Sequence, residues 1–378
     1  MCRRCALQLM EGRSWLEKNS SFRLYDYKYY IVPKPLLQSK EAYRILESYH
    51  TEATDDEKNF KLSTSHQRLL NDREEEALDE LSNQPNAFNC DIIVYEESNK
   101  AFRILTSIEG VFPSRLRALF DAKKKVKDSP LFKGFTVPVF KDRKKVGETP
   151  YEFTFGSFWY FFGKEKERDL SGYFLDIVGK SFQSQKVSYP LLLWGAMEKI
   201  RRQHAQGLPT REATMKAWAC QVYLNELDIL GEYNSQGSLK SNGGLFGLET
   251  DDRVNTAEGF FGEHQEFFDT PAKRAIFLVG AICQLLMDIQ LRDRGSAPFR
   301  ARLQGLKMDQ RLVQSLLPEA VNKLDEYDQN YYRGLERLAS KYFVEAEPVW
   351  KMSRDEVSFH FVTGMNLAVR FKSKGEKQ

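Results

Sequence analysis

AIFLVGAICQLLM, residues 275–287, is the longest apolar stretch of the chain and the segment on which the fold prediction rests. It is shorter than a membrane span requires, and Asp288 follows it at once. Thr270 stands where a helix N-cap is expected and Pro271 where the first helical residue is expected, so the segment predicts a buried helix. The apolar stripe of this helix consists of Ala275, Leu278, Val279, Ile282, Leu285, Leu286 and Ile289.

Further helical patterns surround this segment in the last third of the chain. Residues 309–326 and 328–343 are amphipathic, and SRDE at 353–356 is a capping box in front of another apolar helix. Four helices with short connections predict a helical bundle over residues 254–378. The preceding segment, 231–253, is rich in Gly, Ser and Asn and predicts a linker.

Strand and helix patterns are mixed in the first two thirds of the chain. Two β-branched runs predict a hairpin over 90–108, and Pro113 opens a predicted helix over 113–127. A β-rich stretch at 135–163 follows, and then helical patterns occupy 170–182, 190–206 and 210–230. We therefore expect an α+β fold, with an N-terminal part over 1–110 and a basic α+β middle domain over 111–230, ahead of the linker and the bundle.

Length and cysteine content limit the class of protein. A chain of 378 residues is long enough for two or three domains with a sizeable core. Its five cysteines form no even framework, and no secretory-type apolar segment opens the sequence. These features predict a soluble protein of a reducing cytoplasm, without a membrane partner.

The charges are unevenly distributed although the net charge is only +3. Residues 111–220 contain 21 Lys and Arg against 11 Asp and Glu, whereas residues 221–270 contain 2 against 10. Segregated positive charge is what a polyanion requires, because each neutralised phosphate releases counterions. The alternative is a solvated basic face without a partner. The candidate nucleic-acid-binding residues are Lys123, Lys124, Lys125, Lys127, Lys141, Arg143, Lys144, Lys145, Lys273, Arg274, Arg292, Arg294, Arg300, Arg302 and Lys307.

The sequence contains none of the familiar catalytic motifs. No Walker loop, His-Glu-x-x-His, Gly-x-Ser-x-Gly or dinucleotide fingerprint is present. Glu263, His264 and Glu266 are close in sequence, but adjacent helical residues point apart, which favours a solvated helix face over a metal site. His360 lies between two phenylalanines and is interpreted as a core residue. We therefore expect a protein that is not an enzyme.

Cys2 and Cys5 form a Cys-x-x-Cys pair almost at the start of the chain. Such a pair supplies half of a tetrahedral zinc site, and the other cysteines and histidines show no matching ligand spacing. The pair is interpreted as a doubtful half-site, as two reduced thiols at a frayed end, or as a remnant whose partner ligands come from another chain. No cofactor is certain, and zinc is the one that these residues suggest.

Several strings resemble a known family once the bundle is laid out. PFRARLQGLKMD (298–309) and DEVSFHFVTGMNL (355–367) resemble the two closing motifs of the Csh/TM-type large subunit of type I-B CRISPR surveillance complexes (Cascade), and AKRAIFLVGAICQLLMDIQ (272–290) resembles the helix before them. CRRCALQLMEGRSWLEKNSSFRLYDYKYYIVPK (2–34) is similar to the family segment that starts at the second cysteine pair of a zinc ribbon. EGVFPSRLRALFDA (109–122) resembles its central helix. Against this family the chain lacks an N-terminal region, so Cys2 and Cys5 look like half of a ribbon.

The resemblance implies a non-catalytic subunit of an RNA-guided effector in a prokaryotic cytoplasm. Such a subunit contacts duplex DNA near the protospacer-adjacent motif, stabilises the R-loop and recruits a helicase-nuclease. Its implied partners are the CRISPR guide RNA, the target duplex with its displaced single strand, and the backbone, handle-binding and small subunits of the complex.

Three other classes of function remain open at this point. A zinc-assisted DNA-binding regulator would bind a specific sequence without other subunits. A metal-dependent nucleic-acid enzyme would lose cleavage on replacement of Glu263 or His264. A structural module would bind no nucleic acid, even at low salt.

Overall fold

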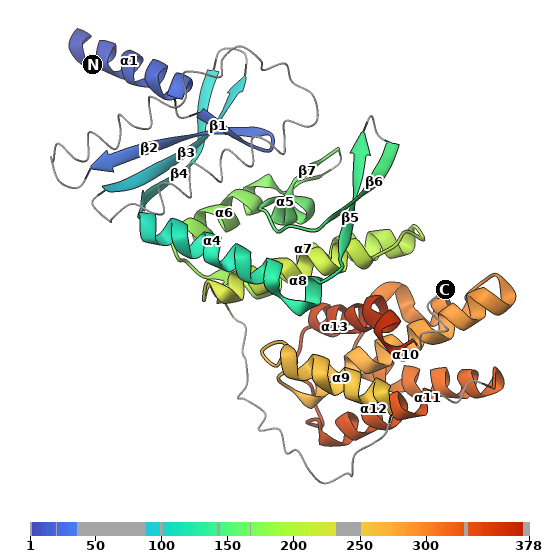
Figure 1. Ribbon diagram of the computed structural model, residues 1–378. Helices are drawn as coiled ribbons and strands as arrows, with labels where there is room; N and C mark the ends of the chain where they lie inside the picture. Colours follow the sequence, from blue (N-terminus) through green and yellow to red (C-terminus); the bar gives the residue numbers. More distant parts are fainter. Residues whose placement is uncertain are drawn as a thin grey trace. The chain divides into compact units, whose positions relative to one another are not determined.

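A computed structural model describes residues 2–19, 21–35, 88–98, 101–141, 144–166, 168–231, 251–328 and 332–372 (Figure 1). Strands and helices are mixed in the first part and helices follow in the last, which confirms the α+β fold class. The helices are α1 (Arg3–Asn19), α4 (Pro113–Asp128), α5 (Gly156–Phe162), α6 (Ser171–Phe182), α7 (Tyr189–Ala205), α8 (Arg211–Glu226), α9 (Asp252–Glu263), α10 (Pro271–Arg294), α11 (Gln310–Glu326), α12 (Arg333–Glu345) and α13 (Arg354–Leu367), with short 3₁₀ segments η2 (Pro130–Phe132), η3 (Pro298–Leu306) and η4 (Ala368–Phe371). The strands are β1 (Ser21–Leu24), β2 (Tyr27–Pro35), β3 (Phe88–Ser98), β4 (Ala101–Val111), β5 (Thr136–Lys141), β6 (Lys144–Pro150), β7 (Lys164–Glu165), β8 (Arg168–Asp169), β9 (Val187–Ser188) and β10 (Leu230–Gly231).

The chain divides into two compact units, which we call the sheet unit and the helical unit. The sheet unit comprises Met1–Val187 and Ala219–Gly231, and the helical unit comprises Ser188–Trp218 and Glu232–Gln378. These bounds differ from the predicted ones, because the sheet and α4 share one unit and the bundle includes α7 and the first half of α8. Most of the predicted linker lies outside the described residues.

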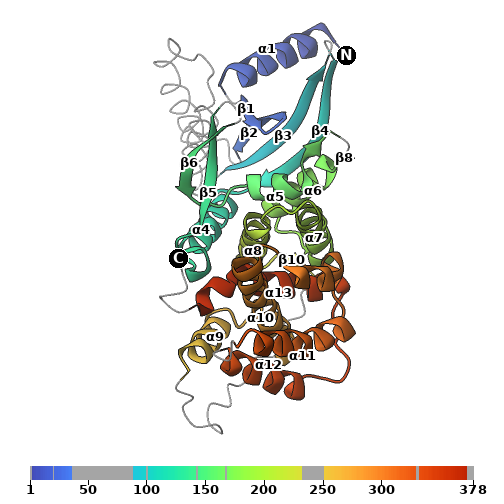
Figure 2. The same cartoon turned by 90° about the vertical axis from the view of Figure 1, so that its right-hand side faces the viewer.

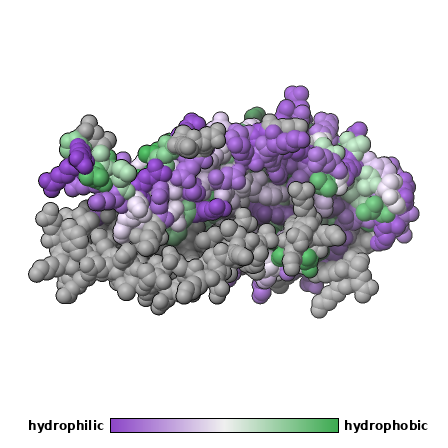
Figure 3. Space-filling view, turned by 90° about the horizontal axis from the view of Figure 1, so that it is seen from above, coloured by the Kyte–Doolittle hydropathy of each residue, from purple (hydrophilic) through white to green (hydrophobic). Residues whose placement is uncertain are grey.

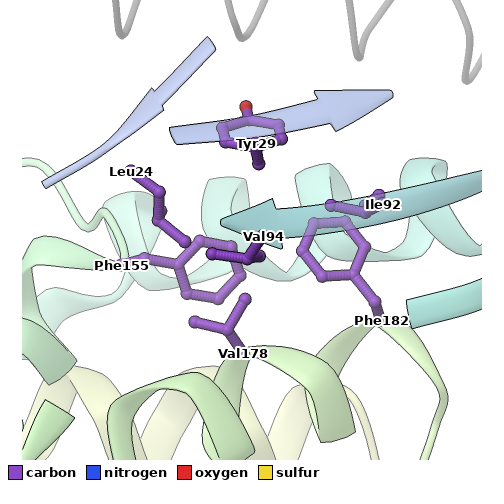
Figure 4. A pocket seen from close by; sticks show the side chains of 7 residues that line it. All are labelled: Leu24, Tyr29, Ile92, Val94, Phe155, Val178 and Phe182. Atoms are coloured by element: carbon purple, nitrogen blue, oxygen red, sulfur yellow. The ribbon is translucent and has the colours of Figure 1, made fainter. Parts of the chain in front are cut away.

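A four-stranded antiparallel sheet in the order β1-β2-β3-β4 forms the base of the sheet unit. Ser98 pairs with Ala101 at the end of the β3–β4 ladder, so the hairpin predicted over 90–108 is confirmed. Side chains alternate between the faces of a strand, and one face of this sheet is apolar. Tyr29, Ile92 and Val94 from that face meet Phe155, ahead of α5, and Val178 and Phe182 of α6 (Figure 4). The void that remains between them measures about 10 Å³, which leaves room for no more than one water.

The helix α4 begins at Pro113, as the sequence predicts, and buries Leu116, Leu119 and Val126 on one face. Arg115, in the string PSRL, turns toward the end of α6, where its Nε donates to the carbonyl oxygen of Ser181 at 2.8 Å. Burial lowers the pKa of Arg115, and the bond to the carbonyl compensates for the lost hydration. Arg115 therefore caps the C-terminal end of α6, because the last carbonyls of a helix lack partners within it.

The helix α1 starts at Arg3, directly after Cys2. Its second half lies beside the sheet, where Arg13 pairs with Glu97 and stacks on Phe102. Leu7, Leu9 and Met10 in its first half are more than half exposed. On the face that Figure 3 shows, the described surface is predominantly hydrophilic, with small hydrophobic areas.

The helical unit is built around α10, which packs against α11, α12 and α13 (Figure 2). Thr270 caps α10 by accepting a hydrogen bond from the amide of Lys273, and Ser353 caps α13 through the amide of Glu356, so both predicted caps are confirmed. Within the described residues α10 is the one helix with the length and hydropathy of a membrane span. Of its most apolar window, 78% is buried inside the protein, which is the situation of a core helix.

Two glycines allow α10 and α13 to approach backbone to backbone. A Cβ on Gly280 would overlap the carbonyl oxygen of Phe361, and a Cβ on Gly364 would overlap that of Phe277. The two contacts are reciprocal, since each glycine faces the other helix. Glycine is required at both positions because no larger residue leaves the backbones this close.

Candidate nucleic-acid interface

Among the candidate cations on α4, Lys124 and Lys125 lie away from its buried face, whereas Lys123 lies on the side of that face, one turn after Leu119. Lys125 pairs with Glu226 at 2.5 Å, and this carboxylate raises the pKa of the lysine. Lys127 pairs with Glu152 at 3.0 Å, and Lys123 is half-buried. Lys124 is exposed and makes no ion pair within the described residues. Lys124 is therefore the α4 lysine that a phosphate reaches without displacing a carboxylate.

The second basic segment of the sheet unit forms the end of a β-hairpin. Lys141 ends β5 and Lys144 begins β6, and these two residues face each other in the register, as do Phe140 and Lys145. Arg143 lies outside the described residues. A two-stranded ribbon of this kind fits the major groove of duplex DNA.

The first two candidate cations of the helical unit contact other residues of that unit. Lys273 is buried, and its Nζ lies 3.0 Å from Asp269 Oδ1 and 3.3 Å from Glu356 Oε1. Arg274 donates to the carbonyl oxygen of Phe268 at 2.9 Å and to the Tyr342 hydroxyl at 3.3 Å. A charge count along the sequence includes such residues although they hold the fold together. Lys273 therefore lies in the core, whereas Arg274 is half-buried and is held by contacts within the unit.

Arg292 and Arg294 stand at the exposed C-terminal end of α10. Arg292 pairs with the neighbouring Asp293 at 2.7 Å, and the Arg294 guanidinium stacks over the Tyr327 ring at 4.9 Å. Cations are favourable at a helix C-terminus because the last carbonyls carry partial negative charge. These two arginines thus have a structural role and are exposed as well.

The segment η3 carries the other three candidate cations. Its apolar residues Phe299, Leu303 and Leu306 are buried, and Arg300, Arg302 and Lys307 are exposed. Arg300 donates to the carbonyl oxygen of His204, at the end of α7. Arg302 forms a two-bond pair with Glu319 of α11, at 2.8 and 2.7 Å. Lys307 makes no ion pair within the part of the chain that the structure describes.

Arg201 on α7 was not among the sequence candidates, yet it connects both closing motifs. Its guanidinium donates to the Leu306 carbonyl oxygen at 3.1 Å, donates to the Ser358 hydroxyl at 3.2 Å and pairs with Asp355 at 2.7 Å. The string IRRQH at 200–204, which also contains Arg202, is the signal in the sequence that could have found it.

The second closing motif, 355–367, is buried over most of its length, and most of its polar side chains contact other residues of the helical unit. Ser358 accepts from the Met308 amide, Thr363 from the Trp218 indole at 2.8 Å, and Asn366 Nδ2 donates to Thr214. His360 is the exception, since neither ring nitrogen has a hydrogen-bond partner in the described residues. Burial lowers its pKa well below the ordinary value, so the ring is neutral.

The Cys2 and Cys5 sulfurs lie 3.1 Å apart at the start of α1, and both residues are exposed. Hydrogen bonds from the Cys5 amide and thiol lower the pKa of Cys2, whereas the same thiol contact raises that of Cys5. Two thiols supply at most half of the four ligands of a tetrahedral zinc site. The described residues contain no group of three or more His, Cys, Asp or Glu that could hold a metal ion.

Glu263 ends α9 and His264 follows it as the C-cap residue. The His264 ring is buried against Phe260, at 4.9 Å between ring centroids, and burial lowers its pKa to about 4. Glu263 is exposed. The two side chains therefore differ in environment and do not form a shared site.

Two family models match this chain. The C-terminal domain of CRISPR-associated protein TM1802 matches residues 153–378, and the central domain of the same protein matches residues 1–111. No curated protein gives a significant match. The matched stretches contain the sheet up to β4 and the whole helical unit, and α4 with the β5–β6 hairpin lies between them. Because the C-terminal model covers more than half of the chain, the chain belongs to the TM1802 family of CRISPR-associated proteins.

Proposed function

We propose that this protein is a non-catalytic large subunit of a type I-B CRISPR surveillance complex. In this role it contacts duplex DNA near the protospacer-adjacent motif, stabilises the R-loop and recruits a helicase-nuclease. The observation that carries the proposal is membership of a CRISPR-associated family. The exposed cations of α4 and η3 support it, as do the lysines in the sequence at the end of the β5–β6 hairpin, since backbone phosphates are held by Lys and Arg.

The energetics of R-loop formation suit modest phosphate contacts. Opening the duplex costs about 1.4 kcal/mol per base step, and pairing with the guide RNA returns most of it. A few contacts to the displaced strand then decide the balance. Exposed lysines and arginines supply such contacts without reading the base sequence.

The proposed partners are the guide RNA, the target duplex, its displaced strand, the other subunits of the complex and the helicase-nuclease. Cys2 and Cys5 would bind zinc only with ligands from another chain, and the proposed location is the cytoplasm of a prokaryote. The alternatives remain a zinc-assisted regulator and a metal-dependent nucleic-acid enzyme, each with its own outcome in the experiment below.

The experiment measures binding of fluorescent single-stranded and duplex DNA by the full chain, first alone and then with guide RNA and the other complex subunits. We expect weak binding by the chain alone, with a Kd of roughly 10⁻⁶ to 10⁻⁴ M and no sequence preference. Guide RNA and the partner subunits should add preference for the complementary target. Tight, sequence-specific binding by the chain alone would favour the regulator. Cleavage with Mg²⁺ or Mn²⁺ that Glu263→Gln abolishes would favour the enzyme.

A further inference from the structure

The segment η3 and the second half of α7 lie side by side in the helical unit. Two hydrogen bonds define this contact: Arg201 reaches the Leu306 carbonyl oxygen at 3.1 Å, and Arg300 reaches the His204 carbonyl oxygen. Both anchors are side-chain to backbone bonds, so they fix the two segments against each other. We call these two segments and the residues that follow η3 the α7–η3 seam; its cations are Lys199 and Arg202 on α7, Arg300 and Arg302 on η3, and Lys307 and Arg311 after it.

The seam combines positive charge from distant parts of the sequence. Lys199 and Arg202 come from α7, three cations come from η3 and the residue that follows it, and Arg311 stands in the first turn of α11. Arg202 pairs with Glu198 at 3.4 Å and Arg302 pairs with Glu319, so part of this charge is neutralised. Lys307 and Arg311 are exposed and form no ion pair with any described residue. Cations that form no pair with a carboxylate are the ones that can bind an external anion.

Contacts within the helical unit explain the second closing motif, 355–367, more fully than the first, 298–309. In the motif 355–367, Asp355, Ser358, Thr363 and Asn366 all contact other parts of the unit. In 298–309 the fold uses the apolar residues, Arg300 and Asp309, whereas Gln304, Gly305 and Lys307 face outward. Gln304, Gly305 and Leu306 all have positive φ, at 45°, 64° and 61°. This turn leaves Gln304, Gly305 and Lys307 outside the packed core.

We propose that the α7–η3 seam binds the phosphodiester backbone of a single nucleic-acid strand. The inference rests on the proposed function and adds to it the place where the strand lies. Arg302 and Arg300 are held in place by Glu319 and by the end of α7, and Lys307 and Arg311 neutralise phosphates. Contacts of this kind accept any base sequence, because every nucleotide carries the same phosphate.

The test uses the full chain and a fluorescent 20-nucleotide oligo-dT, with anisotropy measured from 50 to 300 mM salt. The variant Lys307→Ala with Arg311→Ala removes the two cations that have no ion pair in the described chain. Each lost phosphate contact should lower the slope of log K against log salt by about 0.7 for a single strand. We expect a slope lower by about 1.4 and binding about 25-fold weaker at 0.1 M salt.

The matched control is Lys341→Ala with Lys351→Ala, which removes the same charge from exposed positions on and after α12. It should change the slope by less than about 0.5. Thermal unfolding of both variants verifies that the fold is kept. Equal losses in both variants, or none in the seam variant while the unaltered chain binds, would overturn the seam and leave the proposed function standing. If the unaltered chain binds no oligo-dT at 50 mM salt and also binds no DNA with its guide RNA and partners, both fail.

Discussion

The sheet unit and the helical unit use charged and polar residues in different ways. In the sheet unit the ion pairs named above, such as Arg13–Glu97, Lys125–Glu226 and Lys127–Glu152, lie at the surface, and the core behind the sheet is apolar with a small void. In the helical unit, Lys273 with Asp269 and Glu356 is buried, and so are Thr363 and His360. Surface pairs of this kind contribute about 0–1 kcal/mol each, whereas a broken buried pair costs several. The bundle should therefore tolerate fewer changes than the sheet.

The largest effect is expected at the buried cation. Lys273→Ala leaves Asp269 and Glu356 buried without their counter-charge, so we expect the unfolding free energy to fall by about 3–5 kcal/mol. Chemical denaturation monitored by circular dichroism measures it. The counterpart in the sheet unit is Lys127→Ala, where the pair with Glu152 is exposed and the expected change is below about 1 kcal/mol. Similar losses at the two sites would remove the contrast between the units.

A somewhat smaller effect is expected where the two helices touch. Gly280→Ala places a methyl group against the Phe361 carbonyl and should destabilise the protein by about 2–3 kcal/mol as α10 and α13 separate. Gly259→Ala on α9 is the control, because nothing lies within 4 Å of its added Cβ. There alanine should stabilise the helix by about 0.5–1 kcal/mol. Equal destabilisation by both changes would mean that the close approach of α10 and α13 does not depend on glycine at position 280.

The most gradual effect is a dependence of bundle stability on pH. Burial lowers the pKa values of His204 and His264 to about 4 and that of His360 further, each from 6.5. The unfolded chain then binds protons that the folded chain excludes, so stability is complete above pH 6.5 and decreases as the pH falls below it, by up to about 1.4 kcal/mol per pH unit for each histidine. Glu356 acts in the opposite direction, because burial raises its pKa and protonation relieves that cost.

Thermal unfolding of the full chain at pH 7.5, 6.5, 5.8 and 5.0 measures this dependence. His360→Met should flatten the curve without loss of stability at pH 7.5, since neither ring nitrogen has a hydrogen-bond partner in the described residues. An unchanged pH profile in that variant would mean that His360 titrates normally.

The sequence predicts local features well because their causes are local. Thr270 and Ser353 cap their helices as predicted, the hairpin 90–108 forms, and the apolar stripe of 275–289 is buried. Long-range partners could not be predicted in this way. Lys273 appears as one more cation in the sequence, and only packing reveals Asp269 and Glu356 beside it. Arg201 is likewise inconspicuous until α7 meets η3.

The domain bounds were less predictable for the same reason. Trp218 on α8 lies in the helical unit, where its indole donates to Thr363, although the sequence placed it in the middle domain. A bundle limited to residues 254–378 would lose this residue and Arg201. We therefore expect 188–378 to be the smallest fragment with the complete core of the bundle.

The most direct test of this account is hydrogen–deuterium exchange of the full chain with and without oligo-dT at 50 mM salt. We expect DNA to bind at the exposed cations of the α7–η3 seam, whereas the buried charges stabilise the fold. Binding should therefore slow exchange in 298–311 and 199–206 and leave exchange in α12 unchanged. Bound DNA that leaves 298–311 unprotected, or protects α12 in its place, would contradict it.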